Sequence, residues 1–573
     1  MAQRKATGTR RVWLPAAVFS VLAAGICARL VFLQVIQHAH YAELAHEEQA
    51  ASTTLLARRG SVLDRNGNVL ATSVDTWDLA VSARVWKDPK EAAKGSERLG
   101  ALLGMNAAAL REIVASGSSF DVIIKKDLDY EVGAKILKEK IEGTVLHPNT
   151  ARVNPEGNLA YSLLGFIGAD NTGLAGIEAT YDETLQGRPG LLVFERDTTG
   201  DPIPYGHYIA NDPVPGKDIV LTIDRYLQQL AETHLARAMT EHRAKGGSII
   251  IVDPSTMDIL ASASSPRLQY GVPINDVSQL ELLRDRAVTD LYEPGSVMKV
   301  VTAASAIDAG VVTPNSGYTD TGEVKIYDYT AKNWDNRVYG YQTMTGVLIN
   351  SINTGAIYME RLLGDARFLH YIDAFGFGQP SGIDLSGEAT GIMRRPEDPD
   401  WTVVDTATQS FGQAISVTPI QMITAIAATI NGGYLLKPHM VKAFVDADGY
   451  RQDVQPVVRS RPIREETSAK MRGMLGQVVY PGHPAQPKLY TAGGKSGTAN
   501  VAVTNGYNDV QIASFVGFAP LDNPKILILV KLDENADLLT GAAAAGPVFA
   551  ALADEVLTYL NVQPDSARYV GAR

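Results

Sequence analysis

The sequence has a single cysteine, Cys27, among its 573 residues. One cysteine cannot form an intramolecular disulfide, and it cannot supply a two-cysteine metal or redox motif. No His-Glu-x-x-His motif is present, and the ten histidines are scattered along the chain. The sequence therefore predicts no metal centre and no bound cofactor, and any exported domain has to fold without disulfides.

Long basic runs are also missing beyond the first 11 residues, and the formal net charge is −11. Because a nucleic-acid-binding protein normally carries a basic face, the sequence predicts no nucleic-acid partner. The 51 glycines and 28 prolines show no collagen-like period, and 45% of the residues are hydrophobic, which argues against fibrous and disordered chains. At about 150 residues per domain, the length allows three or four units.

An apolar segment of 22 residues, Val12 to Leu33, follows a flank with four basic residues and no acid. At about 1.5 Å per residue, a helix of this length reaches roughly 33 Å, enough for a bilayer core of about 30 Å. Only Ser20 and Arg29 interrupt it, and Arg29 lies near the far end, where its side chain could reach the headgroups. The basic flank predicts a cytoplasmic N-terminus, so the residues beyond Arg11, with a net charge of −15, are exported.

Two other interpretations of this segment are a cleaved signal peptide and a lipoprotein signal. A cleaved signal peptide has a shorter apolar core, of about 7 to 15 residues, and a small-residue exit that the region around Ala39 matches poorly. Lipoprotein processing at Cys27 requires a small residue before the cysteine, where this chain has Ile26. We therefore predict an uncleaved membrane anchor.

Short-range patterns divide the exported part in two. Asn66-Gly67 between two apolar runs is a strong hairpin signal, because both residues tolerate positive φ. The segment Pro213-Val-Pro-Gly216 is typical of a domain boundary. Before it we expect helices at 89–103, 107–115 and 130–142. After it we expect strands at 218–222, 247–252, 259–262, 514–519 and 526–532, a helix capped by Asp224 and running to about His242, a helical middle from Ser296 to Ile430, and a closing helix at 546–560.

The first motif with chemical content is Tyr292-Glu-Pro-Gly-Ser296-Val-Met-Lys299, which precedes an apolar helical run. Ser296 is expected in the first turn, where free N–H groups and the helix dipole favour a developing oxyanion. Lys299 lies on the same face, so its amine can reach the serine hydroxyl and, with a lowered pKa, activate it as a nucleophile. A single Ser-x-x-Lys also arises by chance, and a helix start with a solvated lysine is the alternative.

Two further motifs offer groups that would complete such a site. Ser351-Ile-Asn353 provides a hydroxyl and a carboxamide that can shuttle a proton and hold a substrate amide, although a turn or helix cap is the simpler interpretation. On an edge strand, Lys495 with Ser496 or Thr498 could bind a carboxylate. Gly497 would let a substrate backbone approach, and the Thr498 N–H could be a second oxyanion donor.

Gly494-Lys495-Ser496 is also how a phosphate-binding Walker loop ends. That loop requires a glycine five residues before Gly494, where this chain has Leu489, so a nucleotide site is disfavoured. Taken in chain order, Ser-x-x-Lys, Ser-x-Asn and Lys-Ser-Gly are the three motifs of penicillin-binding proteins and class A β-lactamases. The three together are far more specific than any one of them.

On these residues the chain resembles the class B penicillin-binding proteins, the monofunctional peptidoglycan D,D-transpeptidases. Met257 and Asn154-Pro155 depart from the family pattern, which puts the subfamily in doubt more than the activity. The matching segments span nearly the whole chain and are Arg59-Gly60, Asp64-Arg-Asn-Gly67, Gly165-Phe-Ile-Gly168, Gly173-Leu-Ala-Gly-Ile-Glu178, Leu221-Thr-Ile-Asp224, Tyr292-Glu-Pro-Gly295, Phe411-Gly-Gln413 and Phe515-Val-Gly-Phe-Ala-Pro520.

The resemblance implies an α/β (α+β) penicillin-recognising serine transpeptidase domain, with an antiparallel sheet flanked by helices and an all-helical subdomain. An elongated α+β pedestal and one N-terminal transmembrane helix would precede it. The expected division is a cytoplasmic N-terminus at 1–11, a transmembrane helix at 12–36, a pedestal of the dimerisation type at 37–215, the transpeptidase domain at 216–565 and a tail at 566–573.

The resemblance also implies roles for the motif residues. Ser296 would be the acylated nucleophile, Lys299 its base, and Ser351 and Asn353 the second catalytic motif. Lys495 would belong to the catalytic set as well. Ser496, Gly497 and Thr498 would bind the substrate, and the N–H groups of Ser296 and Thr498 would form the oxyanion hole.

The implied partners are peptidoglycan stem peptides on nascent glycan strands, β-lactam antibiotics, the lipid bilayer, a membrane glycosyltransferase of the SEDS family and division proteins. The implied location is the bacterial inner (cytoplasmic) membrane, with the catalytic domain outside. Phe194-Glu-Arg-Asp197, Gly200 and Ile203-Pro204 favour the division (septal) branch. An elongation-type transpeptidase, a D,D-carboxypeptidase, a β-lactam-hydrolysing enzyme and a β-lactam sensor are the alternatives.

Overall fold

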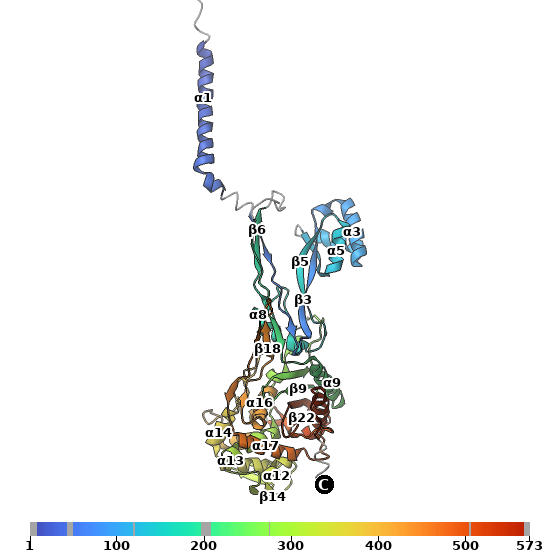
Figure 1. Ribbon diagram of the computed structural model, residues 1–573, viewed down its shortest axis with the longest axis vertical. Coiled ribbons are helices and arrows are strands. Elements are labelled where there is room, and N and C mark those ends of the chain that lie inside the picture. Colours follow the sequence, from blue (N-terminus) through green and yellow to red (C-terminus); the bar gives the residue numbers. More distant parts are fainter. Residues whose placement is uncertain are drawn as a thin grey trace, which may run out of the picture. The chain divides into compact units, whose positions relative to one another are not determined.

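The computed structural model contains two compact units (Figure 1). Unit 1 comprises Met1–Arg58 and Gly187–Pro215, and unit 2 comprises Arg59–Gln186 and Gly216–Arg573. The chain therefore passes between the units after Arg58, after Gln186 and after Pro215. The structure describes residues 9–42, 50–117, 121–195, 208–273, 276–503 and 506–565.

Unit 1 contains the predicted apolar helix, α1 (Thr9–Val31), which a π-helical turn, η1 (Phe32–Ile36), extends. Residues Trp13–Ile36 are long and apolar enough to cross a membrane, and none of this span is buried within the protein. Most of the segment that favours the division branch lies outside the described residues, which stop at 195 and resume at 208. The unit also has an antiparallel sheet in the order β1-β6-β7, made of β1 (Ala50–Leu55), β6 (Gly190–Glu195) and β7 (Tyr208–Asn211).

A seven-stranded sheet joins the two chain segments of unit 2. Its order is β19-β18-β8-β2-β3-β4, and β5 also pairs with β3. The pairs are antiparallel except β2 with β8, which is the pair that connects the segment before Gln186 to the segment after Gly216. The strands are β2 (Val62–Leu63), β3 (Val69–Ser82), β4 (Asp121–Asp129), β5 (Thr144–Val153), β8 (Asp218–Leu221), β18 (Val441–Val445) and β19 (Arg451–Asp453).

Three helices pack beside β3 and β4 and share with these strands a small apolar core that includes Leu79, Trp86 and Leu110. The helix predicted at 89–103 has these bounds, because Asp88 caps its start and Gly104, with φ 68°, ends it. The helix predicted at 130–142 is shorter. The elements are η2 (Val85–Lys87), α3 (Pro89–Leu103), α4 (Ala107–Ser116) and α5 (Tyr130–Glu139), followed by α6 (Tyr161–Leu164), α7 (Gly176–Thr180) and α8 (Asp182–Gln186).

The predicted hairpin at Asn66-Gly67 is confirmed, and it is fastened to the next segment by the buried carboxylate of Asp64. Asp64 accepts hydrogen bonds from the backbone N–H groups of Asn66 and Asn68, each at 2.8 Å, and from the Asn68 amide at 2.9 Å. It also accepts from the N–H of Arg225 at 3.2 Å, the first residue of α9 (Arg225–Glu241). The hairpin therefore contributes to the cap of this helix, beside the predicted cap residue Asp224.

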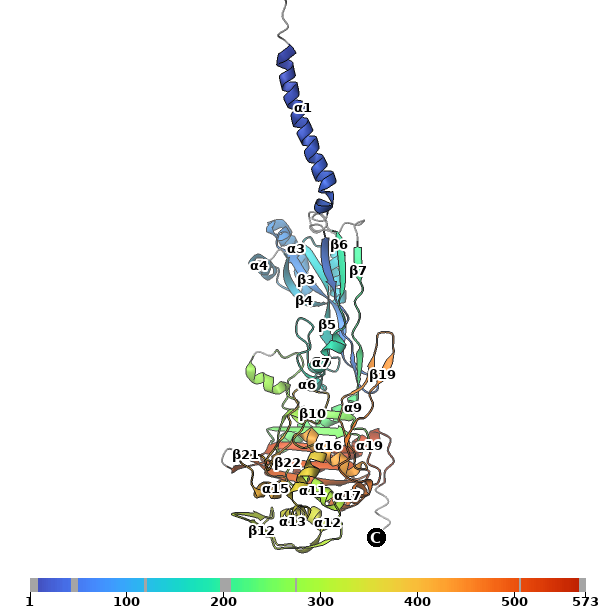
Figure 2. The same ribbon diagram turned by 90° about the vertical axis from the view of Figure 1, so that its left-hand side faces the viewer.

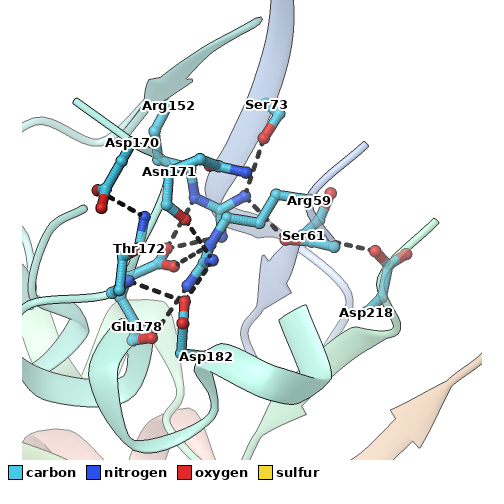
Figure 3. Close-up of polar contacts among 12 residues, drawn as sticks. Arg59, Ser61, Ser73, Arg152, Asp170, Asn171, Thr172, Glu178, Asp182 and Asp218 are labelled. Atoms are coloured by element: carbon cyan, nitrogen blue, oxygen red, sulfur yellow. Dashed lines mark hydrogen bonds and ion pairs between the residues drawn. The ribbon is translucent and has the colours of Figure 1, made fainter. Parts of the chain in front are cut away.

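A buried ionic network lies where the chain enters unit 2 (Figure 3). The guanidinium of Arg59 donates to Glu178 Oε2 and Asp182 Oδ1, each at 2.7 Å, and to the carbonyl oxygens of Asn171 and Glu178. Arg152 donates to the other oxygen of Glu178 at 2.7 Å. Because Arg59 and Glu178 are almost fully buried, these bonds replace the water that both charges lose on folding.

The core of the second segment is a five-stranded antiparallel sheet in the order β10-β9-β23-β22-β21. Successive residues of β9 face opposite sides: Ile249 and Ile251 pack with α9 and α19, whereas Ile250 and Val252 pack with α11, α16 and α17. Helices therefore flank the sheet on both faces, as expected, and every predicted strand of this sheet is present. The elements are β9 (Gly246–Val252), β10 (Ile259–Ser265), β21 (Gly493–Val503), β22 (Gly506–Ala519), β23 (Ile526–Asn535), α11 (Met298–Asp308), α16 (Pro419–Ile430), α17 (Glu465–Val478), α18 (Gly541–Ala544) and α19 (Gly546–Tyr559).

We expected an all-helical subdomain in the middle of this segment. The middle is mostly helical, but small two-stranded sheets interrupt it. Figure 2 shows α12, α13 and β12 on the far side of α11 from β10. The helices are η3 (Val277–Leu283), α10 (Arg286–Thr289), η4 (Gly295–Val297), α12 (Met344–Ile349), α13 (Asn353–Leu363), α14 (Asp365–Ala374) and α15 (Val403–Gln409). The strand pairs are β11 (Gly317–Asp320) with β14 (Gly340–Thr343), β12 (Glu323–Ile326) with β13 (Tyr329–Lys332), β15 (Ile392–Met393) with β16 (Ile415–Ser416), and β17 (Leu435–Leu436) with β20 (Val458–Ser460).

Candidate active site

Ser296 and Lys299 lie together at the start of α11, as the Ser-x-x-Lys motif predicts. Ser296 occupies the 3-10 turn η4, which leads directly into α11, rather than the first turn of the α-helix itself. Lys299 is fully buried, and its Nζ lies 3.0 Å from Ser296 Oγ. The alternative of a helix start with a solvated lysine is therefore excluded.

The surroundings of Lys299 favour an uncharged amine. Nζ donates to the carbonyl oxygen of Ser351 at 2.6 Å and to Oδ1 of Asn353 at 2.7 Å, and Ser351 Oγ lies 3.2 Å away. Burial, and then the charge of Lys495, hold the pKa of Lys299 well below its usual value. A neutral amine has two N–H bonds and one lone pair. With both N–H bonds given to oxygens that only accept, the lone pair is left for the hydroxyl of Ser296.

The second motif is held in place by its own backbone and by a neighbouring strand. Ser351 lies between α12 and α13 with φ 55°, a left-handed conformation that is strained for a residue other than glycine. Asn353, the first residue of α13, donates from Nδ2 to the carbonyl oxygen of Lys332 at 2.8 Å. The two ends of its amide are thereby fixed, one toward Lys332 and the other toward Lys299.

The third motif lies on β21, the predicted edge strand of the five-stranded sheet. Lys495 is 2% exposed, and burial lowers its pKa to about 7. Its Nζ donates to the carbonyl oxygen of Ser496 at 3.0 Å. Thr498 Oγ1 accepts from the N–H of Gly541 at 3.0 Å, which leaves its hydroxyl hydrogen available to a ligand.

Two glycines allow β21 to lie directly against the turn that carries Ser296. A Cβ on Gly497 would stand 2.7 Å from the carbonyl oxygen of Pro294, and one on Gly295 would stand 2.9 Å from that of Thr498. This close contact with Pro294 explains why a glycine is needed at position 497. The expected contact of Gly497 with a substrate backbone stays a prediction. The close approach brings the backbone of Thr498 beside that of Ser296, as an oxyanion hole made of these two N–H groups would require.

A cleft of about 830 Å³ opens above these groups. Lys299 lies behind it, and Gly497 does not line it. No aspartate or glutamate is among the described residues of the lining, although the chain as a whole is acidic. The motif residues that line the cleft are Ser296, Ser351, Asn353, Lys495, Ser496 and Thr498.

Sequence reasoning missed several residues of this cleft. Trp334, Tyr339, Tyr480 and His483 line it, and all four stand in loops that tertiary contacts bring to the site. No spacing rule marks such positions in a single sequence. The segment around Gly412 was identified only by resemblance, and it supports the Ser296 turn by accepting the N–H of Gly295 at 3.0 Å.

An antiparallel sheet with helices on both faces, and a serine that a buried lysine contacts beside the edge strand, define the class of penicillin-recognising serine enzymes. The family model of the penicillin-binding protein transpeptidase domain matches residues 247–554, and that of the penicillin-binding protein dimerisation domain matches residues 54–221. The chain therefore belongs to the penicillin-binding protein transpeptidase family, and within it to the class B D,D-transpeptidases.

Relatives match along almost the whole chain. Stage V sporulation protein D of Bacillus subtilis is 31% identical over 94% of this chain and 84% of its own length. The probable peptidoglycan D,D-transpeptidase PenA of Neisseria meningitidis is 31% identical over 97% of this chain and 94% of its own length. Among solved structures, a peptidoglycan synthetase from Bifidobacterium adolescentis is 28% identical, covers 90% of this chain and 98% of its own, and aligns with a TM-score of 0.73.

Proposed function

We propose that this D,D-transpeptidase forms peptidoglycan cross-links by a two-step acyl transfer through Ser296. Lys299 takes the hydroxyl proton as Ser296 Oγ attacks the penultimate D-Ala carbonyl of a stem peptide, and the C–N bond to the terminal D-Ala breaks as the leaving amine gains a proton. An amine of a neighbouring strand then attacks the ester, forms the new amide and releases Ser296. A β-lactam would follow the first step and leave Ser296 acylated.

The observation that carries this proposal is the environment of the Lys299 amine. A buried lysine 3.0 Å from a serine hydroxyl, with both N–H bonds directed to other oxygens, has the arrangement that a general base needs. Ser351 and Asn353 supply those oxygens, and Ser351 Oγ, 3.2 Å from the amine, offers a route for the proton to the leaving group.

The carboxylate of the donor peptide would bind along β21. Lys495 supplies the charge there, and Ser496, Gly497 and Thr498 supply hydroxyl and backbone groups, consistent with a cleft whose described lining carries no acid. The N–H groups of Ser296 and Thr498 would stabilise the oxyanion of each tetrahedral intermediate.

We further propose a single-pass protein of the bacterial inner (cytoplasmic) membrane, with residues 1–11 inside, 12–36 spanning the bilayer, a pedestal at 37–215, the transpeptidase domain at 216–565 outside and a tail at 566–573. The basic flank and the apolar helix support this topology. A SEDS-family glycosyltransferase and division proteins are the proposed partners, since the family resemblance implies the first and the sequence resembles the division branch.

Labelling with a fluorescent penicillin tests the assignment of the nucleophile. The wild-type protein should be labelled and the Ser296→Ala variant should not, and labelling that survives the substitution would remove Ser296 from this role. Polymerised lipid II, incubated with the purified protein alone and with the glycosyltransferase, tests the reaction. Cross-linked product supports the proposal, whereas free D-Ala without cross-links would identify a carboxypeptidase.

A further inference from the structure

His483 is the one ionisable group of the described cleft lining, apart from the tyrosines and Lys495, and no motif accounts for it. It stands in the loop that follows α17 and precedes β21. Lys495 lies close enough for its charge to add to burial in lowering the pKa of His483. The imidazole is therefore a neutral group beside the cation that is proposed to bind the donor carboxylate.

The loop holds His483 through its backbone and its ring. The His483 N–H donates to the carbonyl oxygen of Tyr480 at 2.9 Å, and the His483 carbonyl oxygen accepts from Gln486 at 2.9 Å. The Gln486 side chain in turn accepts from the N–H of Gly482 at 2.8 Å. Rings of Tyr480 and Phe515 pack around the imidazole, with centroids 5.4 Å and 6.3 Å away. The ring is thus fixed in position.

One further contact sets the tautomer of the imidazole. The N–H of Ala485, a fully buried residue, donates to His483 Nδ1 at 3.1 Å. Because Nδ1 accepts, the proton of the neutral ring has to lie on Nε2. Nε2 has no hydrogen-bond partner among the described residues, so this N–H can meet a ligand in the cleft.

We propose that His483 donates a hydrogen bond from Nε2 to the terminal carboxylate of the donor stem peptide, next to Lys495. The inference rests on the proposed function and adds a residue to its carboxylate site. A neutral donor with a fixed tautomer keeps its hydrogen at every pH where the enzyme works. It would therefore continue to recognise the anion when Lys495, with a pKa of about 7, is partly uncharged.

Two near-isosteric variants of the full-length protein separate the two ring nitrogens. His483→Asn places an acceptor close to the position of Nδ1, preserving the bond from Ala485, but removes the donor at Nε2. His483→Gln places an N–H close to the position of Nε2 and so keeps a donor there. The probes are two small thioester donors that differ only in a terminal carboxylate or carboxamide, and kcat/KM is measured from thiol release.

We expect His483→Asn to lower kcat/KM for the carboxylate donor by about 10- to 100-fold, the range for a hydrogen bond to a charged group, and to change that for the carboxamide donor by less than about twofold. His483→Gln should keep most of the preference. An equal loss for both donors would mean that His483 only positions the loop, and would overturn the proposal, as would no loss for either. Failure of the proposed function is a separate result, because wild-type protein would then release thiol no faster than Ser296→Ala.

Discussion

At the scale of single residues, the proposed chemistry depends on the amine of Lys299, whose pKa is lowered by burial. Replacing Lys299 with alanine should slow acylation by a penicillin about 100- to 10,000-fold, the usual contribution of a general base. Stopped-time labelling of both proteins measures the rate. Lys470→Ala is the matched control, because this lysine lies exposed on α17 and pairs with Glu466 on the surface. Acylation of Lys299→Ala at near the control rate would contradict the role of base.

The two lysines of the site should affect the pH profile of kcat/KM in opposite directions. Activity should rise with pH as Lys299 loses its proton, and should fall as pH passes about 7, where Lys495 loses the charge that is proposed to bind a carboxylate. The profile of kcat/KM for the carboxylate-terminated thioester checks this. The carboxamide-terminated donor should show only the rising limb, so a fall of equal size for both donors would remove Lys495 from carboxylate binding.

At the scale of the helix, α13 carries a buried acid two turns beyond Asn353. Burial and the adjacent Asp365 raise the pKa of Glu360 to about 8. The folded protein therefore keeps a proton at pH 7 that the unfolded chain releases near its ordinary pKa. The protonated Glu360 therefore contributes stability that is fully present below the pKa of this residue in the unfolded chain. That stability is lost as pH rises through its pKa in the folded protein.

Glu360→Gln, which keeps the shape and the donor without the charge, should stabilise the protein by roughly 1–3 kcal/mol at pH 8. The gain should shrink toward zero at pH 5, where Glu360 is protonated in the folded protein. Apparent melting temperatures of both proteins at the two pH values measure it. Glu465 is exposed, so Glu465→Gln should change stability equally at the two pH values. An equal gain for Glu360→Gln at both pH values would contradict a protonated Glu360.

The hairpin at Asn66-Gly67 provides a second prediction at this scale. Asp64→Ala removes a fully buried carboxylate and takes the acceptor from the partly buried N–H groups of Asn66, Asn68 and Arg225, which should cost about 2–4 kcal/mol. Asp88→Ala removes a cap of α3 that is exposed, and should cost about 1 kcal/mol. Thermal unfolding compares the two. Equal shifts would mean that the Asp64 contacts do not fasten the hairpin to α9.

These elements also show how far a single sequence leads. Bounds were predictable where residues with special backbone preferences mark them, as Asp88 and Gly104 do for α3. The predicted end of α5 lies three residues too late. The helix stops because Lys140 adopts a left-handed conformation, φ 45°, which a lysine in the sequence does not predict. The motif residues were predictable because their chemistry recurs at fixed spacing. His483 was not, because only the tertiary fold brings its loop to the cleft that Lys495 also lines.

At the scale of the whole molecule, the acidic net charge and the cleft have opposite character. The chain carries −11 overall, yet the described cleft lining has Lys495 and no carboxylate. On the proposed function, an anionic substrate would therefore be attracted by the local site and not by the field of the protein as a whole, whose sign repels it. Salt should consequently weaken substrate binding little, since the one cation in the described lining, Lys495, is buried and poorly screened.

The Arg59 network should stabilise unit 2 at the point where the chain first passes into it from unit 1. Arg59→Met leaves buried Glu178 with Arg152 alone and Asp182 without its cation, which should destabilise unit 2 by about 3–5 kcal/mol. Arg395→Met breaks a more exposed pair with Asp373 and should cost at most about 1 kcal/mol. The apparent melting temperature of each full-length variant, with and without added sodium chloride, measures both effects. Added salt should erase the Arg395 difference and leave the Arg59 difference nearly intact, since only the exposed pair is screened. Similar melting of the two variants would show that the buried network does not stabilise the unit.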